Sequence, residues 1–292
     1  MKERAYVMSE QEKYLFDLRG YLVVPGALTP DEIDRCNKAI DRFAHDMTML
    51  EPGSLSKGSS ALTGLRGRKQ LSGMLGWPRP YCDVFRLLLV HPVVVARLNE
   101  LCDKRFRLDH GPLLIEAEAG TEGHRLHSAG EPFGYSVAYH HQNGRIFCRG
   151  VTVAWQLTDV NAGDGGFAIV PGSHKASEPL PDAVASVEED MAMVVQPQMK
   201  AGDVLFFAET ATHGTLPWTG QGQRRSVLYK YASHGAARAV GRHFTPEQRY
   251  GDWTAQLSAA QRAVLFGPGV HTEGLLPILE SDGDTVQVAK YV

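Results

Sequence analysis

Residues 105 to 235 contain a series of short, strand-like runs, and this series constrains the fold more than any other feature of the chain. The runs are rich in Val, Ile, Phe and Tyr, and Gly, Pro, Asn or Asp separates them, which is typical of strands joined by turns. They are FRLDHGPLLIEAEA, RIFCRGVTVAWQLTDV, GGFAIV, MVVQP, DVLFFAE and RSVLYKYAS. The series predicts an all-β core.

Helical patterns flank this core. Thr29, Pro30 and Glu32 form a capping box with proline at the first helical position, and apolar residues follow at helical spacing. Further helical stretches cover residues 91–101 and begin near residue 245, and the last pattern stops at Gly267-Pro268. The stretch 52–80 is rich in Gly, Ser and Pro and is predicted to be a long loop.

Helices followed by strands indicate an α+β fold in one domain. We expect a helical N-terminal part (1–104), a β core (105–235) and a C-terminal helical region (236–292). The hydrophobic content of 43% is ordinary for a globular protein of this length, so a sizeable core can form.

Composition also excludes several classes of protein. A net charge of −3 argues against nucleic acid as a partner. The sequence contains no run of 18 apolar residues, so it predicts no membrane-spanning helix. The N-terminus lacks the apolar core of a secretory signal, and the four cysteines show no CxxC spacing. We therefore expect a cytoplasmic protein with reduced thiols. The sequence does not predict its oligomeric state.

The segment WQLTDVNAGDGGFAIVPGSHK, residues 155–175, is the most specific signal. It resembles the signature of the phytanoyl-CoA dioxygenase family, with its Trp-bearing strand, acidic turn, Gly pair and Pro-Gly-Ser-His run. The resemblance implies a double-stranded β-helix (a jelly-roll, cupin-like core) that uses Fe(II), 2-oxoglutarate and O2. Within the segment, we expect Trp155 in the core and His174 in a structural turn.

The resemblance also implies two site residues downstream. His213 stands where the family has its distal iron-ligand histidine, and Arg224 stands where a basic residue binds the far carboxylate of 2-oxoglutarate. Side chains alternate along a strand, so Arg224 and Arg225 face opposite ways. Which of the two points inward is left open by the sequence.

The proximal iron ligands depart from the family pattern. The usual pair is His-x-Asp or His-x-Glu, since residues i and i+2 of a strand share a face. Only His271-Thr-Glu273 fits, but it follows Arg224, in the wrong order, and is interpreted as surface. The first candidate for the proximal ligand is His127, which has Ala129 at the acid position.

Two other histidines remain candidates for the proximal ligand. His141 has Asn143 at the i+2 position, and His140 has Gln142 there. Neither side chain is a carboxylate, so all three candidates lack the acid at the same place.

A missing carboxylate suggests a particular chemistry. In the 2-oxoglutarate-dependent halogenases, which the pattern resembles, a small residue replaces the acid and a halide binds the iron. Ala129 is small enough for chloride, so we expect chlorination of an unactivated C–H bond in a small molecule. One alternative is a hydroxylase whose acid is Glu116 or Glu118. Another is a metal-free family member that only binds a ligand.

The substrate is not identified by the sequence. Basic residues in the Gly-rich loop and beyond the last core strand suggest an anionic substrate, such as a nucleotide or a carrier-linked acyl group. These residues are Arg66, Arg68, Lys69, Arg238, Arg242 and Arg249.

Overall fold

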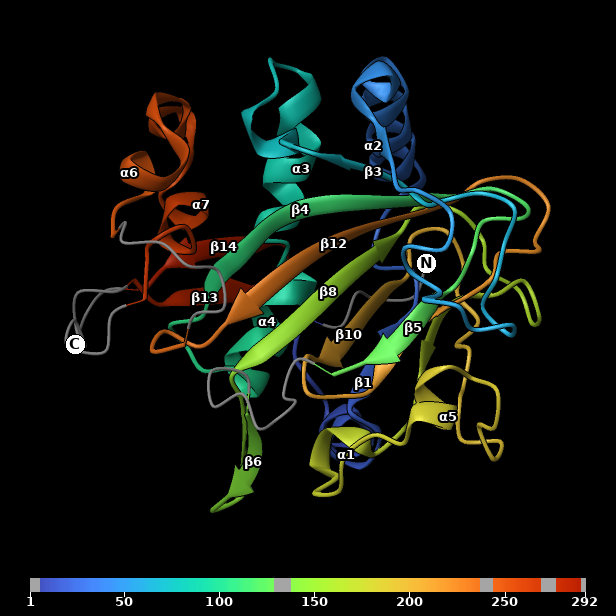
Figure 1. Cartoon of the computed structure of the whole chain (residues 1–292). Coiled ribbons are helices and arrows are strands. Elements are labelled where there is room, and N and C mark those ends of the chain that lie inside the picture. Colours follow the sequence, from blue (N-terminus) through green and yellow to red (C-terminus); the bar gives the residue numbers. More distant parts are fainter. Residues whose placement is uncertain (1–5, 129–137, 237–243, 269–276, 290–292) are drawn as a thin grey trace.

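The structure, a computed structural model, describes residues 6–128, 138–236, 244–268 and 277–289. Two antiparallel sheets form its centre (Figure 1). The large sheet has the strand order β1-β10-β8-β12-β4-β3-β2, and the small sheet has the order β5-β11-β9. The double-stranded β-helix expected from the resemblance is thereby confirmed.

The strands of the two sheets come from distant parts of the chain. The large sheet contains β1 (Tyr21–Val24), β2 (Thr48–Met49), β3 (Lys69–Ser72), β4 (Arg107–Ala117), β8 (Gly150–Gln156), β10 (Val204–Ala208) and β12 (Arg224–Ala232). The small sheet contains β5 (His124–His127), β9 (Gly166–Ile169) and β11 (His213–Leu216). Two hairpins lie outside them: β6 (Tyr139–Gln142) with β7 (Arg145–Cys148), and β13 (Leu279–Asp282) with β14 (Thr285–Val288).

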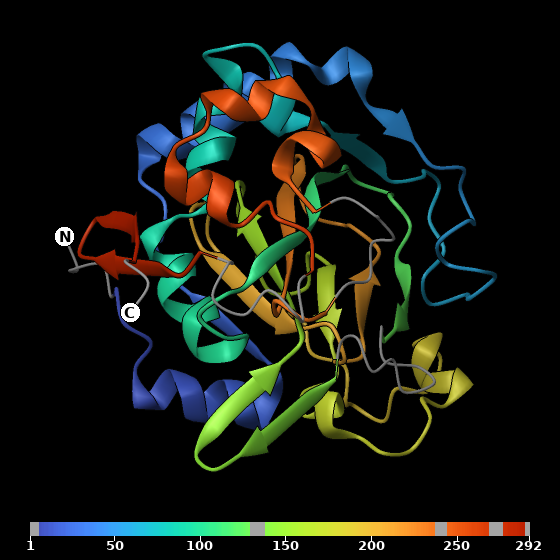
Figure 2. The same cartoon turned by 90° about the vertical axis from the view of Figure 1, so that its left-hand side faces the viewer.

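Helices cover the outer face of the large sheet (Figures 1 and 2). The helices that contribute to the main core there are α1 (Glu10–Arg19), α2 (Pro30–Arg42), α3 (Tyr81–Leu89), α4 (Pro92–Leu101) and α7 (Ala259–Ala263). Two others lie elsewhere: α5 (Asp182–Ala185) contacts β5 of the small sheet, and α6 (Pro246–Tyr250) contacts the short helix η5 (Asp252–Gln256). The capping box predicted for α2 is confirmed, because Thr29 Oγ1 accepts from the Glu32 N–H and the Glu32 carboxylate accepts from the Thr29 N–H. No helix in the described ranges combines the length and apolar character needed to cross a bilayer.

Strand β8 shows how alternation divides the core. Val153 and Trp155 belong to the main cluster under the helices, whereas Ala154 belongs to a second cluster between the two sheets. The position expected for Trp155 is therefore confirmed. In the second cluster the rings of Phe167 and Phe207 lie 4.9 Å apart, and this contact joins the small sheet to the large one.

Tyrosine hydroxyls fix β12 against the helices. Tyr229 donates to the Phe85 carbonyl oxygen at 2.8 Å, and Tyr231 donates to the Leu89 carbonyl oxygen at 2.7 Å. Both rings are fully buried, so these hydrogen bonds satisfy hydroxyls that would otherwise lack partners. The strand that carries Arg224 is thus held to α3 from its outer face.

Three details differ from the expectation. The stretch 52–80 contains β3 and the short helix η2 (Met74–Gly76), so it is not a loop throughout. The C-terminal region is not wholly helical, because β13 and β14 pair there. The run MVVQP forms an isolated bridge, Ile169 with Val195, in place of a strand.

Candidate active site

Two histidines face each other in the small sheet. His127 ends β5 and His213 begins β11, and the two residues are direct partners in the antiparallel register. Their ring centroids lie 4.6 Å apart. The structure therefore brings together the two residues that the sequence suggested as iron ligands.

The ring orientation of both histidines is set in the same way. Nδ1 of His127 lies 3.0 Å from the Arg125 carbonyl oxygen, and Nδ1 of His213 lies 2.8 Å from the Ala211 carbonyl oxygen. A carbonyl oxygen only accepts, so each Nδ1 carries the proton and each Nε2 keeps its lone pair. Metal-binding histidines typically donate one ring N–H to a carbonyl oxygen in this way and bind the metal through the other nitrogen.

The surroundings of these imidazoles favour the neutral form, by full burial for His213 and by partial desolvation for the more exposed His127. Desolvation lowers the pKa of His213 to about 4 and lowers that of His127 from its ordinary value. His124, whose ring lies 4.5 Å from that of His127, has its pKa lowered to about 3 by burial and by the neighbouring charges. A neutral imidazole is the form that binds a metal ion. The residues present therefore suit an Fe(II) ion.

A third protein ligand is not evident. Within the described ranges, no group of three or more His, Cys, Asp and Glu side chains converges as a metal site. Ala129, the residue expected at the vacant acid position, lies outside the described residues, so its placement stays a prediction.

The alternative histidines lie elsewhere. His140 and His141 are on β6, in the hairpin that projects at the lower edge of Figure 1, and both are exposed. The His140 ring stacks on Phe147 of the same hairpin. The geometry favours His127 over these two because His127, although also exposed, is the register partner of His213. His174 is buried, with Nε2 3.1 Å from the Asp17 carbonyl oxygen, in the structural position expected for it.

Glu116 and Glu118, the two acids considered as replacements for the missing iron-ligand carboxylate, form ion pairs with basic side chains. Glu116 pairs with Arg225 at 2.8 Å, and Glu118 pairs with Arg66 at 2.9 Å and Lys69 at 3.3 Å. Because Glu116 is opposite Arg225 in the register, it shares the outer face of the large sheet with that residue.

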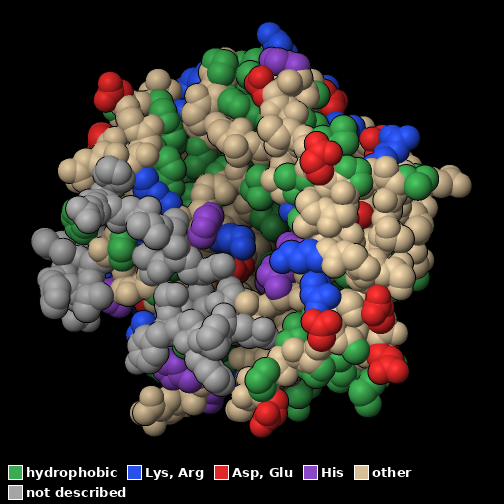
Figure 3. Space-filling model, viewed as in Figure 1, with side chains coloured by type: hydrophobic (Ala, Val, Ile, Leu, Met, Phe, Trp, Pro, Cys, Tyr) green, Lys and Arg blue, Asp and Glu red, His purple; other side chains and the backbone are tan. Residues whose placement is uncertain are grey.

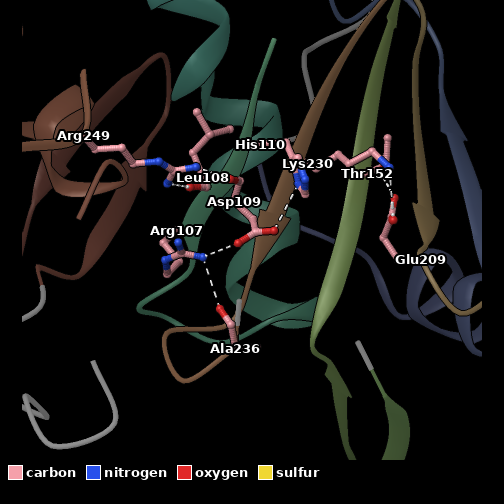
Figure 4. Close-up of polar contacts among 9 residues, drawn as sticks. All are labelled: Arg107, Leu108, Asp109, His110, Thr152, Glu209, Lys230, Ala236 and Arg249. Atoms are coloured by element: carbon pink, nitrogen blue, oxygen red, sulfur yellow. Dashed lines mark hydrogen bonds and ion pairs between the residues drawn. The ribbon is translucent and has the colours of Figure 1, made fainter. Parts of the chain in front are cut away.

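A buried acid that the sequence analysis missed lies closer to the histidines. Glu209 follows β10, and its carboxylate accepts from Thr152 Oγ1 and pairs with Lys230 Nζ at 3.2 Å (Figure 4). The Glu209 charge raises the pKa of both His127 and His213. Its only signal in the sequence is its place at the end of a core strand, four residues before His213.

Arginines 224 and 225 point to opposite sides of β12. Arg225 pairs outward with Glu116 and with Asp41 at 2.7 Å. Arg224 points inward and is 4% exposed, and a Cβ added at Gly166 of β9 would lie 2.7 Å from its Nε. Burial and the charge of Arg68 lower the pKa of Arg224 to about 10. The inner side chain, Arg224, is the one placed to meet a carboxylate between the sheets.

A cavity of about 450 Å³ opens between the large sheet and the C-terminal helices. It is lined by His110, Leu228 and Lys230 from the inner face of the large sheet and by Tyr250 and Trp253 from the C-terminal helices. In Figure 3 this face is hollowed at its centre, with histidine and Lys or Arg side chains around the hollow. The positive charge of Lys230, which lines this cavity, contributes to the lowered pKa of His127 and His213.

Most of the basic residues considered for an anionic substrate are engaged elsewhere. Arg66 and Lys69 pair with Glu118, and Arg249 donates to the carbonyl oxygens of Leu108 and Asp109 (Figure 4). Arg238 and Arg242 lie outside the described residues. The exception is Arg68, which is 8% exposed and makes no side-chain hydrogen bond or ion pair with the described residues.

The fold and this pair of histidines define a class of proteins, the cupin-like oxygenases. Sequence comparison then gives the family: the model of the phytanoyl-CoA dioxygenase (PhyH) family matches residues 16–226. The chain belongs to this family of iron- and 2-oxoglutarate-dependent oxygenases, and the resemblance inferred from residues 155–175 is confirmed. None of the curated proteins matches the sequence significantly.

Solved structures share the fold. One is HygX from Streptomyces hygroscopicus with nickel, 2-oxoglutarate and hygromycin B bound, at 21% identity and a TM-score of 0.63, covering 77% of this chain and 87% of HygX. Another is SnoN, a non-heme α-ketoglutarate-dependent epimerase from nogalamycin biosynthesis, at 21% identity and a TM-score of 0.56, covering 77% of this chain and 83% of SnoN. HygX has also been solved with iron bound, and SnoN in complex with Fe3+, α-ketoglutarate and nogalamycin RO.

Proposed function

We propose that the protein uses Fe(II), 2-oxoglutarate and O2 to modify a C–H bond of a small molecule. His127 and His213 hold the iron, and Arg224 holds the far carboxylate of 2-oxoglutarate. The observation that carries the proposal is the register pair of histidines, each with Nδ1 on a carbonyl oxygen and Nε2 available. When bound, iron with O2 and 2-oxoglutarate supplies an oxidant strong enough for an unactivated carbon.

The protein's own groups place and shield the reactants. Arg224 can take a carboxylate through two parallel N–H···O bonds, which fixes the orientation as well as the charge of the co-substrate. Burial of Arg224 and His213 excludes water and strengthens these interactions. The cavity accepts the substrate, with Tyr250 and Trp253 as surfaces for a ring or an aliphatic chain and with Lys230 near the iron ligands.

The reaction that we infer is halogenation. Ala129 stands two residues after His127, where the family has its acid. Two neutral histidines leave the charge of Fe(II) uncompensated, and chloride supplies both a ligand and a negative charge. A nucleotide-like or other anionic small molecule is the substrate we expect for this reaction.

A hydroxylase is the second candidate, and Glu209 favours it. This carboxylate is buried, and its charge acts on both histidines. If it replaces the missing acid, no position remains for a halide. Its bonds with Thr152 and Lys230 would then have to be exchanged for the metal.

The first experiment tests the metal site. His127→Ala and His213→Ala should each lose stoichiometric Fe(II) binding, measured by metal analysis after anaerobic loading. They should also lose conversion of 2-oxoglutarate to succinate, whereas the exposed His141→Ala serves as the matched control and keeps both. Full iron binding and succinate formation by His213→Ala would refute the assignment of His213 as an iron ligand.

The second experiment separates the two reactions. Product mass spectrometry is compared with chloride, with bromide and without halide, and halogenation gives a product whose mass follows the halide. Ala129→Asp should abolish that product, because a carboxylate excludes the halide sterically and by charge. A hydroxylated product that is insensitive to halide, and that Glu209→Gln abolishes, would establish the hydroxylase instead.

A further inference from the structure

Two arginine side chains are buried between the sheets without an anionic partner. Arg68 is 8% exposed and Arg224 is 4% exposed, and Nε of each lacks a hydrogen-bond partner. No ion pair or side-chain hydrogen bond joins either guanidinium to another described residue. Burying an unpaired charge is strongly unfavourable, so the arrangement calls for an anion that the protein chain does not supply.

The strand register places the two arginines in one row. Lys69 of β3 is opposite Glu116 of β4, so Arg68, one residue earlier, continues the register opposite Ala117. Ala117 in turn is opposite Arg224 of β12. Residues of one row point to the same face, so Arg68, Ala117 and Arg224 share the inner face while Lys69, Glu116 and Arg225 share the outer one.

The spacing of this row suits a carboxylate. Strands lie about 4.8 Å apart, so the Arg68 and Arg224 backbones are separated by roughly 10 Å with one residue between them. That residue is Ala117, whose single methyl group leaves room for two long side chains to converge. The positive charge of Arg68 also lowers the pKa of Arg224, of His124 and of His127, which places Arg68 near both Arg224 and the histidine pair.

The position of Arg68 is fixed by its backbone. The Arg68 carbonyl oxygen accepts from the Leu50 N–H at 3.0 Å, and the Arg66 carbonyl oxygen accepts from the Glu122 N–H at 2.9 Å, two residues before β5. Gly67 approaches so closely that a Cβ there would lie 1.6 Å from the Leu50 carbonyl oxygen. The segment is thus attached to the strand that carries His127.

One acid lies within electrostatic range of Arg68 but is already satisfied. The Glu122 charge raises the pKa of Arg68, yet its carboxylate accepts from the backbone N–H groups of Gly53, Leu55 and Ser56 at 2.9, 3.3 and 3.1 Å. Glu122 therefore holds the 53–56 turn, and it does not neutralise Arg68 by direct contact.

We propose that Arg68 is a second guanidinium for the far carboxylate of 2-oxoglutarate, so that Arg68 and Arg224 hold this group between them across Ala117. The inference rests on the proposed function. It makes Arg68 a determinant of co-substrate specificity, because a 2-oxo acid with no second carboxylate would leave both guanidiniums buried and unpaired.

The test compares Arg68→Gln, Arg224→Gln and the double variant with Arg66→Gln, an exposed control from the same segment. Calorimetry measures 2-oxoglutarate binding to anaerobic iron-loaded protein and glutarate binding to metal-free protein. Glutarate keeps both carboxylates but lacks the 2-oxo group, so it reports the arginines independently of iron. Loss of a charge-assisted hydrogen bond should weaken binding about 10- to 100-fold in each single variant.

The double variant shows whether one carboxylate is shared. Its loss should be smaller than the product of the two single losses, because the two side chains contact the same group. Arg68→Gln should also raise the melting temperature of the ligand-free protein, since it removes an unpaired buried charge. This readout shows that the variant folds.

Three outcomes would overturn the inference. If Arg68→Gln binds 2-oxoglutarate like the wild type while Arg224→Gln does not, Arg68 has another role and the proposed function stands. If the two losses multiply fully, the arginines bind separate anions. If neither variant changes binding, the assignment of Arg224 in the proposed function fails as well.

Discussion

Gly166 provides a way to displace the Arg224 side chain without changing Arg224 itself. Its φ of +81° is in the left-handed region, and an added Cβ would lie 2.7 Å from Arg224 Nε and 2.9 Å from Cδ. An alanine at this position costs about 1 kcal/mol of folding free energy through its backbone alone. The contact with a buried side chain also forces the guanidinium to move.

Gly163 in the same turn is a matched control. Its φ is also +81°, but nothing lies within 4 Å of an added Cβ. Gly163→Ala should therefore lose a similar stability, about 1 kcal/mol in urea unfolding, and keep its affinity for 2-oxoglutarate. Gly166→Ala should lose that stability and also bind 2-oxoglutarate about 10- to 100-fold more weakly, as expected for a disrupted charge-assisted contact.

Calorimetry of the two anaerobic, iron-loaded variants decides the question. Wild-type affinity in Gly166→Ala would refute the reasoning, because it would mean that the carboxylate is bound away from the Gly166–Arg224 contact. Equal losses of affinity in both variants would also refute it, since the turn conformation would then be responsible instead of the displaced side chain.

Other variants address the outer face and the pH dependence. Arg225→Gln leaves Glu116 buried without its nearest cation, so it should cost about 3 kcal/mol in urea unfolding while 2-oxoglutarate binding stays unchanged; a loss of binding would contradict the outward assignment. Burial lowers the pKa of His174 to about 4 from an ordinary 6.5, so the neutral ring stabilises the fold above pH 6.5. That stability, up to about 3 kcal/mol, should be lost as pH falls from 6.5 to 4, and His174→Gln should flatten the stability profile in this window. An unchanged slope in His174→Gln would show that other groups dominate.

The local signals in the sequence were strong enough to predict several elements. Thr29-Pro30 begins a helix with a capping box, as the spacing to Glu32 indicated, and a helix also begins at Thr245-Pro246, as expected. Alternation along β12 predicted that Arg224 and Arg225 face opposite ways. The family resemblance predicted His213, and the order of the motifs made His127 the first candidate for the other histidine. These features depend on neighbours in the chain, so a sequence displays them.

Features that depend on tertiary contacts were missed. Helix α3 begins at Tyr81 and its N-cap, Pro80, provides no side-chain cap, while β13 and β14 are stabilised by packing on α4 and α7, so none of these elements carries a clear local signal. Arg66 and Arg68 look alike in the sequence, but in the folded chain Arg66 is exposed and Arg68 is buried. The burial of Glu209 is likewise a result of the two sheets meeting.

The candidate site is divided between two sheets, so the distance between the sheets fixes the distance between the histidine pair and Arg224. The small sheet carries His127 and His213, whereas the large sheet carries Arg224, and in the proposed function one molecule of 2-oxoglutarate spans both. The Phe167–Phe207 contact, which also places Phe207 4.6 Å from the His213 ring, sets this spacing. A change such as Phe207→Leu would therefore shift the iron ligands relative to the arginines. If the proposed function holds, core residues at this contact would influence which length of co-substrate fits, and variation in them would change the enzyme without altering any residue that touches a ligand.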